Sequence, residues 1–288
     1  MRVAHIVIIH KNLVQLARLI KRMQHPQFDF YIHVDAKVSA EEFEDLKNLP
    51  NVIFIKNRIA CNWGGFTILR AIFNSLNEVI SSGQKYGHIN LMSGQDYPIC
   101  TPQYIYDFLQ QQSGKNFVAY DASQDTDWWK GAADRYERYH LTDVNIPGKY
   151  FIERMLNKFT PARKFPEFSK LYGSNKSTWW TISWECAVYL NDKVRESPKL
   201  ISFLKFCWGT DEFAIPTLIM NSPFKDQVVN DSLRYIDWSE GKPSPRVFDI
   251  TDFEKISGSK MLFARKFDMD HDIAILNKID EELLAVKE

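Results

Sequence analysis

Short apolar runs alternate with segments of helical periodicity over the first 120 residues of this 288-residue chain. Residues 3–9 form a continuous run rich in Val and Ile, which is typical of a strand buried on both faces. Similar runs cover residues 28–34, 52–55, 88–92 and 117–120. Because strands that alternate with helices form parallel sheets, the sequence predicts an α/β, Rossmann-type fold with a mostly parallel sheet flanked by helices.

The segments between these runs carry helix signals. Asn12 precedes apolar residues spaced as on one face of a helix. Ser39 and Glu42 have the spacing of a capping box, and residues 66–80 place six apolar side chains on one helical face. The threonine–proline pair at 101–102 is typical of a helix start. Each predicted helix therefore connects one strand with the next.

Polar residues follow the predicted strands. Ligands of such sheets bind beyond the carboxyl ends of the strands. Asp35, Asp121 and the Ser-Gly-Gln-Asp segment at 93–96 come at three of these ends. We therefore expect them to surround a common crevice.

Residues 121–176 interrupt the alternation with a loop-rich insertion. They show little periodicity and include Trp128, Trp129 and a charged, aromatic stretch at 134–140. A long irregular segment inside a compact domain is more often functional than not. We predict that residues 128–140 form a wall of the site, because indole and phenol rings offer stacking faces beside polar groups.

Ordered elements return in the remainder of the chain. Strands are predicted at 178–183, 233–236 and 261–263, and helices are predicted to begin near Trp184, at Thr210 and near Asp272. Neither a repeat nor a low-complexity linker divides the chain. Residues 1–288 are therefore predicted to form a single domain.

Composition excludes several classes of protein. The 36 basic and 36 acidic side chains balance, whereas proteins that bind nucleic acid usually carry a basic excess. The four cysteines are too widely spaced for a disulfide framework or a zinc site. Neither a signal-peptide core nor an apolar window of about 20 residues occurs. We therefore expect a cytoplasmic protein, or one peripherally associated with the inner face of the membrane.

Common nucleotide-binding and hydrolase motifs are missing from the sequence. It contains no P-loop, no G-x-G-x-x-G and no G-x-S-x-G. Asp125-Thr126-Asp127 is an Asp-x-Asp, which in nucleotide-sugar transferases often holds a divalent cation on a diphosphate. It also fits a solvated loop. A second acidic group, at 268–272, fits a helix start equally well.

Two further groups of charges have a functional and an ordinary interpretation. Asp211 and Glu212 follow Thr210, where acids favour a helix start and where a carboxylate base would be held rigidly. Basic residues near the C-terminus fit either a solvated face or a phosphate clamp. These basic residues are Arg246, Lys260, Arg265 and Lys266.

The chain resembles glycosyltransferase family 14, which comprises the core-2/I-branching N-acetylglucosaminyltransferases and the peptide O-xylosyltransferases. The matching segments run in the family's order over nearly the whole chain. They are Phe-Tyr-Ile-His-Val-Asp-Ala-Lys at 30–37, Trp-Gly-Gly at 63–65, Ile-Asn-Leu-Met-Ser-Gly-Gln-Asp-Tyr-Pro-Ile at 89–99, Trp-Trp-Thr-Ile-Ser at 179–183, Thr-Asp-Glu at 210–212 and Leu-Phe-Ala-Arg-Lys-Phe-Asp at 262–268.

The resemblance implies a GT-A-type fold, a UDP-sugar donor and inversion at the anomeric carbon without a metal or other cofactor. GlcNAc and xylose are both compatible donor sugars, and the acceptor would be a hydroxyl of a glycan or glycoconjugate. Residues 1–120 would form the nucleotide-binding half, and residues 121–288 the acceptor-binding and catalytic half. Since the chain lacks the membrane anchor and cysteine pairs of the animal enzymes, a soluble, bacterial-type member that builds a surface glycan fits best.

The resemblance also assigns roles to single residues. Glu212 matches the general base, and Lys266 matches the basic residue that binds the donor diphosphate. Arg246 is a looser match to a second such residue, and we add Arg265 to the donor-binding set. Asp35 lies where the family contacts the nucleoside.

Acceptor-binding residues are expected in two segments that hold the acceptor in the branching enzymes, together with the crevice residue Asp96 and the insertion residue Trp129. The residues from the two segments are Arg135, Tyr136, Arg138, Tyr235 and Asp237. Two other functions remain open at this stage. One is a metal-dependent transferase that uses Asp125 and Asp127, and the other is a non-catalytic glycan-binding module whose aromatic side chains stack on sugars.

Overall fold

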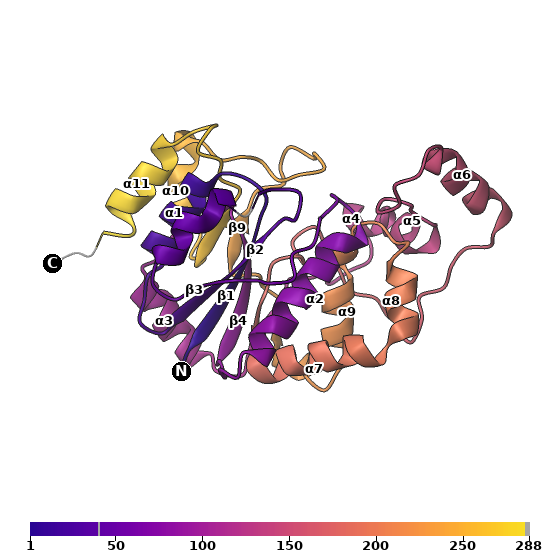
Figure 1. Cartoon of the computed structure of the whole chain (residues 1–288), viewed down its shortest axis with the longest axis horizontal. Coiled ribbons are helices and arrows are strands. Elements are labelled where there is room, and N and C mark those ends of the chain that lie inside the picture. Colours follow the sequence, from indigo (N-terminus) through magenta and orange to yellow (C-terminus); the bar gives the residue numbers. More distant parts are fainter. Residues whose placement is uncertain (40, 286–288) are drawn as a thin grey trace.

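The computed structural model describes residues 1–39 and 41–285, which form a seven-stranded sheet, a three-stranded sheet and surrounding helices. Figure 1 shows α1 (Leu13–Arg22) on one side of the strands and α2 (Phe66–Ser81) with α7 (Trp184–Glu196) on the other. The predicted α/β class, with a large and mostly parallel sheet between helices, is confirmed.

The first four strands of the large sheet are parallel, in the order β3–β2–β1–β4. Their bounds are Val3–Ile9 for β1, Phe28–Val34 for β2, Val52–Phe54 for β3 and His88–Ser93 for β4. Each lies within a residue or two of its prediction, because β1, β2 and β4 are buried on both faces and such strands are built from mostly apolar runs, whereas the edge strand β3 is only partly buried.

Three short strands, which break the parallel pattern, complete the large sheet. β7 (Thr181–Ser183) is antiparallel to β4 and to β6 (Asn116–Phe117), and β8 (Val228–Val229) is parallel to β6. The predicted strands at 117–120 and 178–183 were too long. Beyond Phe117 the chain leaves the sheet, and the Thr178 hydroxyl bonds to the Asp211 carboxylate instead of packing in a strand.

The small sheet brings the C-terminal region beside the end of β4. Its order is β5–β10–β9, with bounds Asp96–Pro98, Phe263–Arg265 and Arg234–Ile236 respectively. β10 begins two residues later than predicted. Because Arg265 pairs in register with Asp96, the basic residues that follow β10 lie next to the crevice segment 93–96.

Helices of the first half begin largely where the sequence places them. α1 is capped by the Asn12 side chain, which accepts from the Gln15 N–H, and α3 (Pro102–Gln111) is capped by Thr101. The segment Glu41–Asn48 (η1) is a 3₁₀ helix and not the predicted α-helix. Ser39 Oγ accepts from the Glu41 N–H, one residue earlier than in a capping box.

The insertion contains three helices that the sequence analysis did not predict. They are α4 (Asp127–Lys130), α5 (Ala132–Glu137) and α6 (Lys149–Phe159). Two are too short to show a periodicity, and α6 buries none of its residues completely. In Figure 1, α6 lies at the end of an arm that points away from both sheets.

The remaining helices cover the edges of the sheets. They are α8 (Pro198–Leu204), η2 (Thr210–Glu212), α9 (Ala214–Met220), η3 (Lys225–Gln227), η4 (Ile250–Asp252), α10 (Phe253–Ser257) and α11 (Ala274–Glu282). The helix predicted to start at Thr210 is a single 3₁₀ turn followed by α9. Over the described part of the chain, no helix has the length and apolar character needed to cross a membrane.

The core divides into two apolar layers, one on each face of the large sheet. Val3, Val7 and Ile9 of β1 belong to the layer under α1, and Ala4 and Ile6 belong to the layer under α2. This alternation follows from the two-residue period of a strand. Burial on both faces leaves the carboxyl end of the central strands as the place where polar groups become accessible.

Replacing Asn12 by alanine is expected to lower the free energy of unfolding by about 1 kcal/mol, because the cap of α1 is lost. Asn12 also has a left-handed backbone (φ 60°), which alanine adopts poorly and glycine readily. Asn12→Gly should therefore lose less stability than Asn12→Ala. Urea unfolding of both variants tests this, and equal stability of Asn12→Ala and the wild type would contradict it.

Candidate active site

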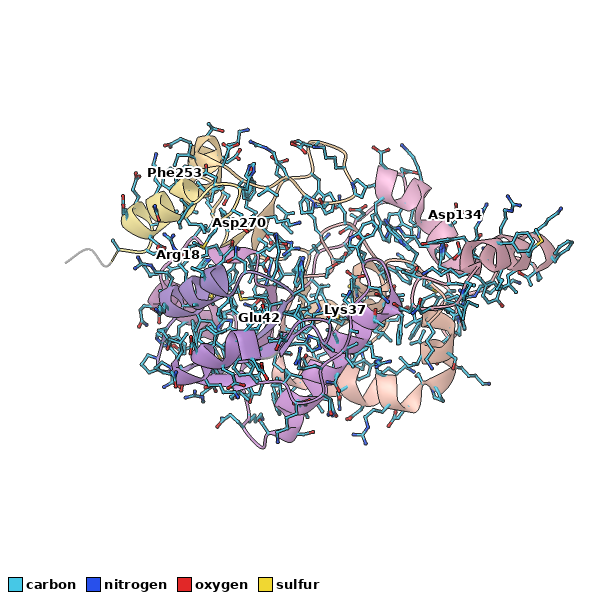
Figure 2. The ribbon with its side chains drawn as sticks, turned by 45° about the horizontal axis from the view of Figure 1, so that its top comes forward. Arg18, Lys37, Glu42, Asp134, Phe253 and Asp270 are labelled. Atoms are coloured by element: carbon cyan, nitrogen blue, oxygen red, sulfur yellow. The ribbon has the colours of Figure 1, made fainter. Side chains whose placement is uncertain are left out.

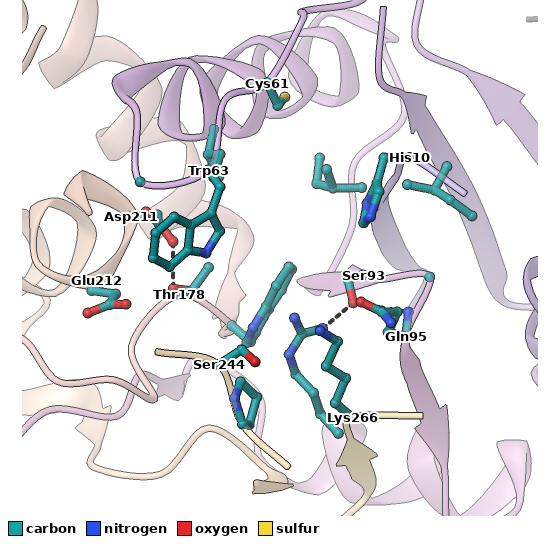
Figure 3. Close-up of a pocket in the computed structure, with 18 of the residues that line it drawn as sticks. His10, Cys61, Trp63, Ser93, Gln95, Thr178, Asp211, Glu212, Ser244 and Lys266 are labelled. Carbon is teal, nitrogen blue, oxygen red and sulfur yellow. Dashed lines mark hydrogen bonds between the residues drawn. The ribbon is translucent and has the colours of Figure 1, made fainter. Parts of the chain in front are cut away.

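A cavity of about 660 Å³ opens where the carboxyl ends of β1, β2 and β4 meet. Residues directly after these strands line it, including His10 after β1, Asp35 after β2, and Gly94 and Gln95 after β4. Figure 3 shows His10 and Gln95 on one side of this space and Glu212 on the other. The volume suits a small-molecule ligand, and the position is the one expected for a sheet of this type. The crevice residue Asp121 does not line it.

The Asp35 carboxylate is held rigidly at the cavity wall. Oδ1 accepts from the Lys37 N–H at 2.8 Å, and Oδ2 accepts from the Cys61 N–H at 3.2 Å. The Lys37 ammonium lies 3.9 Å from Oδ2. Only 4 % of the Asp35 side chain is exposed, so a ligand meets this carboxylate in one orientation.

Glu212 occupies the opposite wall, and only one of its oxygens is engaged. Oε2 accepts from Trp128 Nε1 at 2.6 Å and from the Arg135 guanidinium at 2.8 Å. Among the described residues, none donates to Oε1. The pKa of Glu212 is raised to about 7, chiefly by burial and also by the nearby Asp211, although Arg135 and Trp128 oppose this shift. A carboxylate with such a pKa can accept a proton near neutral pH.

Arg135 is fixed between two indole rings. Its guanidinium carbon lies 5.0 Å from the Trp128 ring centroid and 4.5 Å from that of Trp208, both within cation–π range. Gly209, with a φ of 63°, allows the close approach, since a Cβ there would lie 2.5 Å from a guanidinium nitrogen. Arg135 does not line the cavity but orients Glu212, which does.

Asp211 lines the cavity beside Glu212. Its Oδ2 accepts from the Thr178 hydroxyl at 2.8 Å, which Figure 3 shows as a dashed line. Burial raises the pKa of Asp211, while Thr178, Arg135 and Arg265 favour its charged form. The Thr-Asp-Glu turn thus presents two neighbouring carboxylates, each held through one oxygen, Asp211 by Thr178 and Glu212 by Trp128 and Arg135.

Arg265 and Lys266 bring positive charge to the cavity from the end of β10. Arg265 donates to the Asp96 carboxylate at 2.9 Å and to the Ser93 hydroxyl, and its guanidinium lies 4.4 Å from the Trp179 ring centroid. Asp96 is completely buried behind the wall, where Arg234 also approaches it. Two guanidiniums therefore share one carboxylate, and the ion pair with Asp96 holds Arg265 against the cavity wall.

The Lys266 ammonium is not paired in this way. Within residues 1–39 and 41–285, no carboxylate lies within 4.0 Å of its Nζ. The pKa of Lys266 is lowered by burial and by the adjacent charges of Arg265 and Lys11, although Asp268 opposes the shift. Since these cations repel each other, an anion bound among them would be stabilised.

The structure does not bring Arg246 into the cavity, contrary to the expected contact with the diphosphate. Its guanidinium bonds to Asp252 and, at 3.0 Å, to Asp249, and it lies 3.9 Å from both Asp237 and Glu240. Four carboxylates thus surround this one charge. The residues just before it, Pro243 to Pro245 in sequence, line the cavity instead.

All seven residues predicted to bind the acceptor lie outside the cavity lining; Asp96 and Arg135 are described above, and the other five have packing or surface partners. Tyr136 packs near Phe165 and Phe213, Arg138 pairs with exposed Asp134, Tyr235 stacks on Phe248, Asp237 accepts from the Ser239 N–H, and Trp129 packs edge-on against Trp128. The mixture of Trp, Tyr and Arg at 128–140 therefore serves mainly to position Glu212, through Trp128 and Arg135.

Four tryptophans line the cavity that the sequence analysis did not select as site residues. They are Trp63, Trp179, Trp208 and Trp238. Trp63 packs edge-on against Trp208 at 5.3 Å and stays 63 % exposed. Indole faces that line a cavity suit the apolar face of a sugar or a base. Trp63 and Trp179 stand inside segments that carry the family resemblance, whereas Trp208 had no sequence signal except its place before Thr210.

The two acids of the Asp-x-Asp segment do not line the cavity. Asp125 accepts from the Ser123 hydroxyl at 2.9 Å, and Asp127 pairs with Lys130 at 2.6 Å on the surface. A search of the described residues finds no group of three or more His, Cys, Asp or Glu side chains that could hold a metal ion.

Comparison with known proteins identifies relatives over the whole chain. The family model of the Core-2/I-Branching enzymes matches residues 3–261. Xylosyltransferase 2 of Canis lupus familiaris is 24 % identical over 310 residues, and a xylosyltransferase of Ciona intestinalis is 22 % identical over 302 residues. Each alignment covers 98 % of this chain but 34 % of the relative, so the chain spans about a third of their length.

Solved structures include one of mouse xyloside xylosyltransferase 1 in its apo form. It aligns with 91 % of this chain and 97 % of that chain, at 11 % sequence identity and a TM-score of 0.41.

Proposed function

Because the chain belongs to the Core-2/I-Branching enzyme family, we propose that it is an inverting glycosyltransferase that transfers a sugar from a UDP-sugar to a hydroxyl of a glycan or glycoconjugate without a metal. One observation carries the proposal. One cavity holds Glu212, whose pKa is raised and whose Oε1 receives no bond from the described residues, and Lys266, whose ammonium has no carboxylate partner among them.

Glu212 is proposed to act as the general base. Inversion at the anomeric carbon requires the acceptor hydroxyl to lose its proton as it attacks. The free Oε1 can take that proton, while Trp128 and Arg135 hold Oε2 in place. A base that is positioned in this way, with a pKa close to the working pH, accelerates such a step by roughly 10²–10⁴-fold.

Lys266 is proposed to stabilise the leaving group. As the bond to the sugar breaks, the β-phosphate of UDP gains negative charge, and a fixed cation in a site poor in water meets that charge without reorganisation. Arg265 lines the same wall, but it is held in an ion pair with Asp96, whereas Lys266 has no carboxylate partner among the described residues. Asp35 is proposed to contact the nucleoside, since its carboxylate faces the cavity from the end of β2.

A panel of UDP-sugars tests the activity directly. The relatives named above are xylosyltransferases, so UDP-xylose comes first and UDP-GlcNAc second. Released UDP is measured with each donor, with and without glycan and peptide acceptors. If no donor releases UDP and UDP gives no thermal stabilisation, a non-catalytic glycan-binding module would be favoured. In such a module the four cavity tryptophans would stack on the sugar rings of the bound glycan.

Activity is expected to fall on the acid side of about pH 7, where Glu212 becomes protonated and no longer accepts a proton. Arg135 lowers the pKa of Glu212, so Arg135→Met should move this acid limb of kcat/KM to higher pH. Arg138→Met is the matched control, because Arg138 is 61 % exposed and pairs with Asp134 instead. Identical profiles for Arg135→Met and the wild type would show that Arg135 does not tune Glu212.

A further inference from the structure

Helix α6 packs against the molecule through its polar face and not through its apolar face. Its polar residues Lys149, Glu153 and Asn157 are four residues apart and therefore share one face. Glu153 accepts from the Leu141 N–H at 2.7 Å, and Asn157 accepts from and donates to the backbone of Tyr139 at 2.7 and 2.8 Å. The face that would normally meet water is thus bonded to the preceding loop.

The apolar face of α6 is consequently turned outward. Phe151, Met155 and Phe159 are also four residues apart, on the side opposite to Glu153, and Ile152 lies beside them. Phe151 is 61 % and Phe159 75 % exposed. Single exposed apolar residues are common, but several on one face of a helix mark an interaction surface. Figure 2 shows the side chains of this arm projecting away from the rest of the molecule.

Positive charge borders this apolar face. Residues 146–164 contain five Lys and Arg and a single acid, Glu153, although the whole chain has no net charge. Arg154 and Lys158 are exposed and lie next to the phenylalanines on the helix surface, whereas Glu153 faces the loop. The outward side of α6 therefore carries aromatic rings, and its charged side chains are all cations.

We propose that α6 docks on an anionic lipid bilayer, with its apolar face at the level of the acyl boundary and its cations at the headgroups. Exposed aromatic rings flanked by Lys and Arg are the properties of helices that lie in the membrane interface. A second copy of the chain is a less suitable partner for this face. A symmetric contact would place Arg154 and Lys158 of one copy against Arg154 and Lys158 of the other, and these like charges repel.

Docking through α6 also bears on the proposed site. The arm is anchored beside the elements that hold the catalytic carboxylate, since the Arg163 N–H donates to the Glu137 carbonyl of α5, which also carries Arg135. If the proposed function holds, acceptors attached to the bilayer would be presented on the Glu212 side. Binding to lipid does not itself depend on that function.

Vesicle sedimentation of the full chain tests the proposal. The wild type should sediment with an equal mixture of phosphatidylcholine and phosphatidylglycerol, but not with phosphatidylcholine alone, and high salt should weaken binding. Phe151→Ser/Phe159→Ser and Arg154→Gln/Lys158→Gln should each reduce the partition coefficient by about tenfold or more. Tyr104→Ser, which removes an exposed ring of α3, is the control and should bind like the wild type.

Other results would overturn the proposal. They are equal binding to neutral vesicles, wild-type binding by both double variants, or no binding at all. If the wild type does not bind lipid but light scattering shows a dimer, and Phe151→Ser/Phe159→Ser dissociates that dimer, the apolar face would be assigned to a second copy of the chain. UDP release with a soluble acceptor should be unchanged in this variant. A failure of the UDP-release assay would therefore count against the proposed function and not against lipid docking.

Discussion

Replacement of Glu212 by glutamine is expected to lower turnover by roughly 10²–10⁴-fold, the contribution of a well-placed general base. Glutamine keeps the size of the side chain and retains an amide oxygen that can accept from Trp128 and Arg135. It cannot take up the proton of the acceptor hydroxyl. The loss should therefore appear in the chemical step, measured in a single turnover, while the affinity for UDP stays close to that of the wild type.

Asp211→Asn is the matched comparison for this variant. Asp211 lines the same cavity, where its Oδ2 accepts from Thr178, but the family resemblance matches the general base to Glu212 and not to Asp211. The loss of turnover in Asp211→Asn should be smaller than in Glu212→Gln. Normal turnover of Glu212→Gln would show that Glu212 is not the base and would make Asp211 the next residue to consider.

Removal of the Lys266 ammonium is expected to reduce both UDP affinity and turnover, whereas excess EDTA should leave the wild type active. Loss of one preorganised stabilising group costs roughly 10²–10³-fold in turnover. Lys266→Arg should retain part of the activity, because it keeps the charge but changes the geometry of donation. Lys255→Ala, which removes an exposed lysine of α10, is the control.

Inactivation by EDTA that Mn²⁺ reverses would contradict this prediction. It would revive the metal-dependent alternative and direct attention to Asp125 and Asp127. Both acids lie outside the cavity, so the insertion would then have to move to bring them to a bound diphosphate. Asp125→Asn and Asp127→Asn would be inactive in that case and fully active in the metal-independent one.

Local sequence patterns were sufficient for the central part of the fold. β1, β2 and β4 are buried on both faces, and strands in that environment are built from mostly apolar runs that the sequence shows directly. The caps at Asn12 and Thr101 were equally readable, because a cap depends on residues three positions apart. The short strands β6, β7 and β8 were overestimated or unrecognised, since two or three residues carry too little periodicity.

The residues of the site differ in how far the sequence predicts their positions. Asp35 and Ser93 come at strand ends, so the strand pattern alone predicted that they would approach one edge of the sheet, whereas Lys266 was assigned only through the family resemblance. The partners of Glu212 come from 84 and 77 positions away in the sequence, at Trp128 and Arg135. Nothing in the local sequence distinguishes these two from Tyr136 or Arg138, which pack or pair elsewhere.

Charge neutralisation was the other property that only the tertiary structure decided. Arg246, Arg265 and Lys266 are all cations in the sequence, but carboxylates surround Arg246, Asp96 pairs with Arg265, and Lys266 has no such partner among the described residues. The exposed apolar face of α6 was likewise determined by contacts, because Glu153 and Asn157 bond to a neighbouring loop. A residue's type and order set which groups are available, whereas long-range packing sets which of them remain free to act, because pairing depends on atoms that the chain brings together only when it folds.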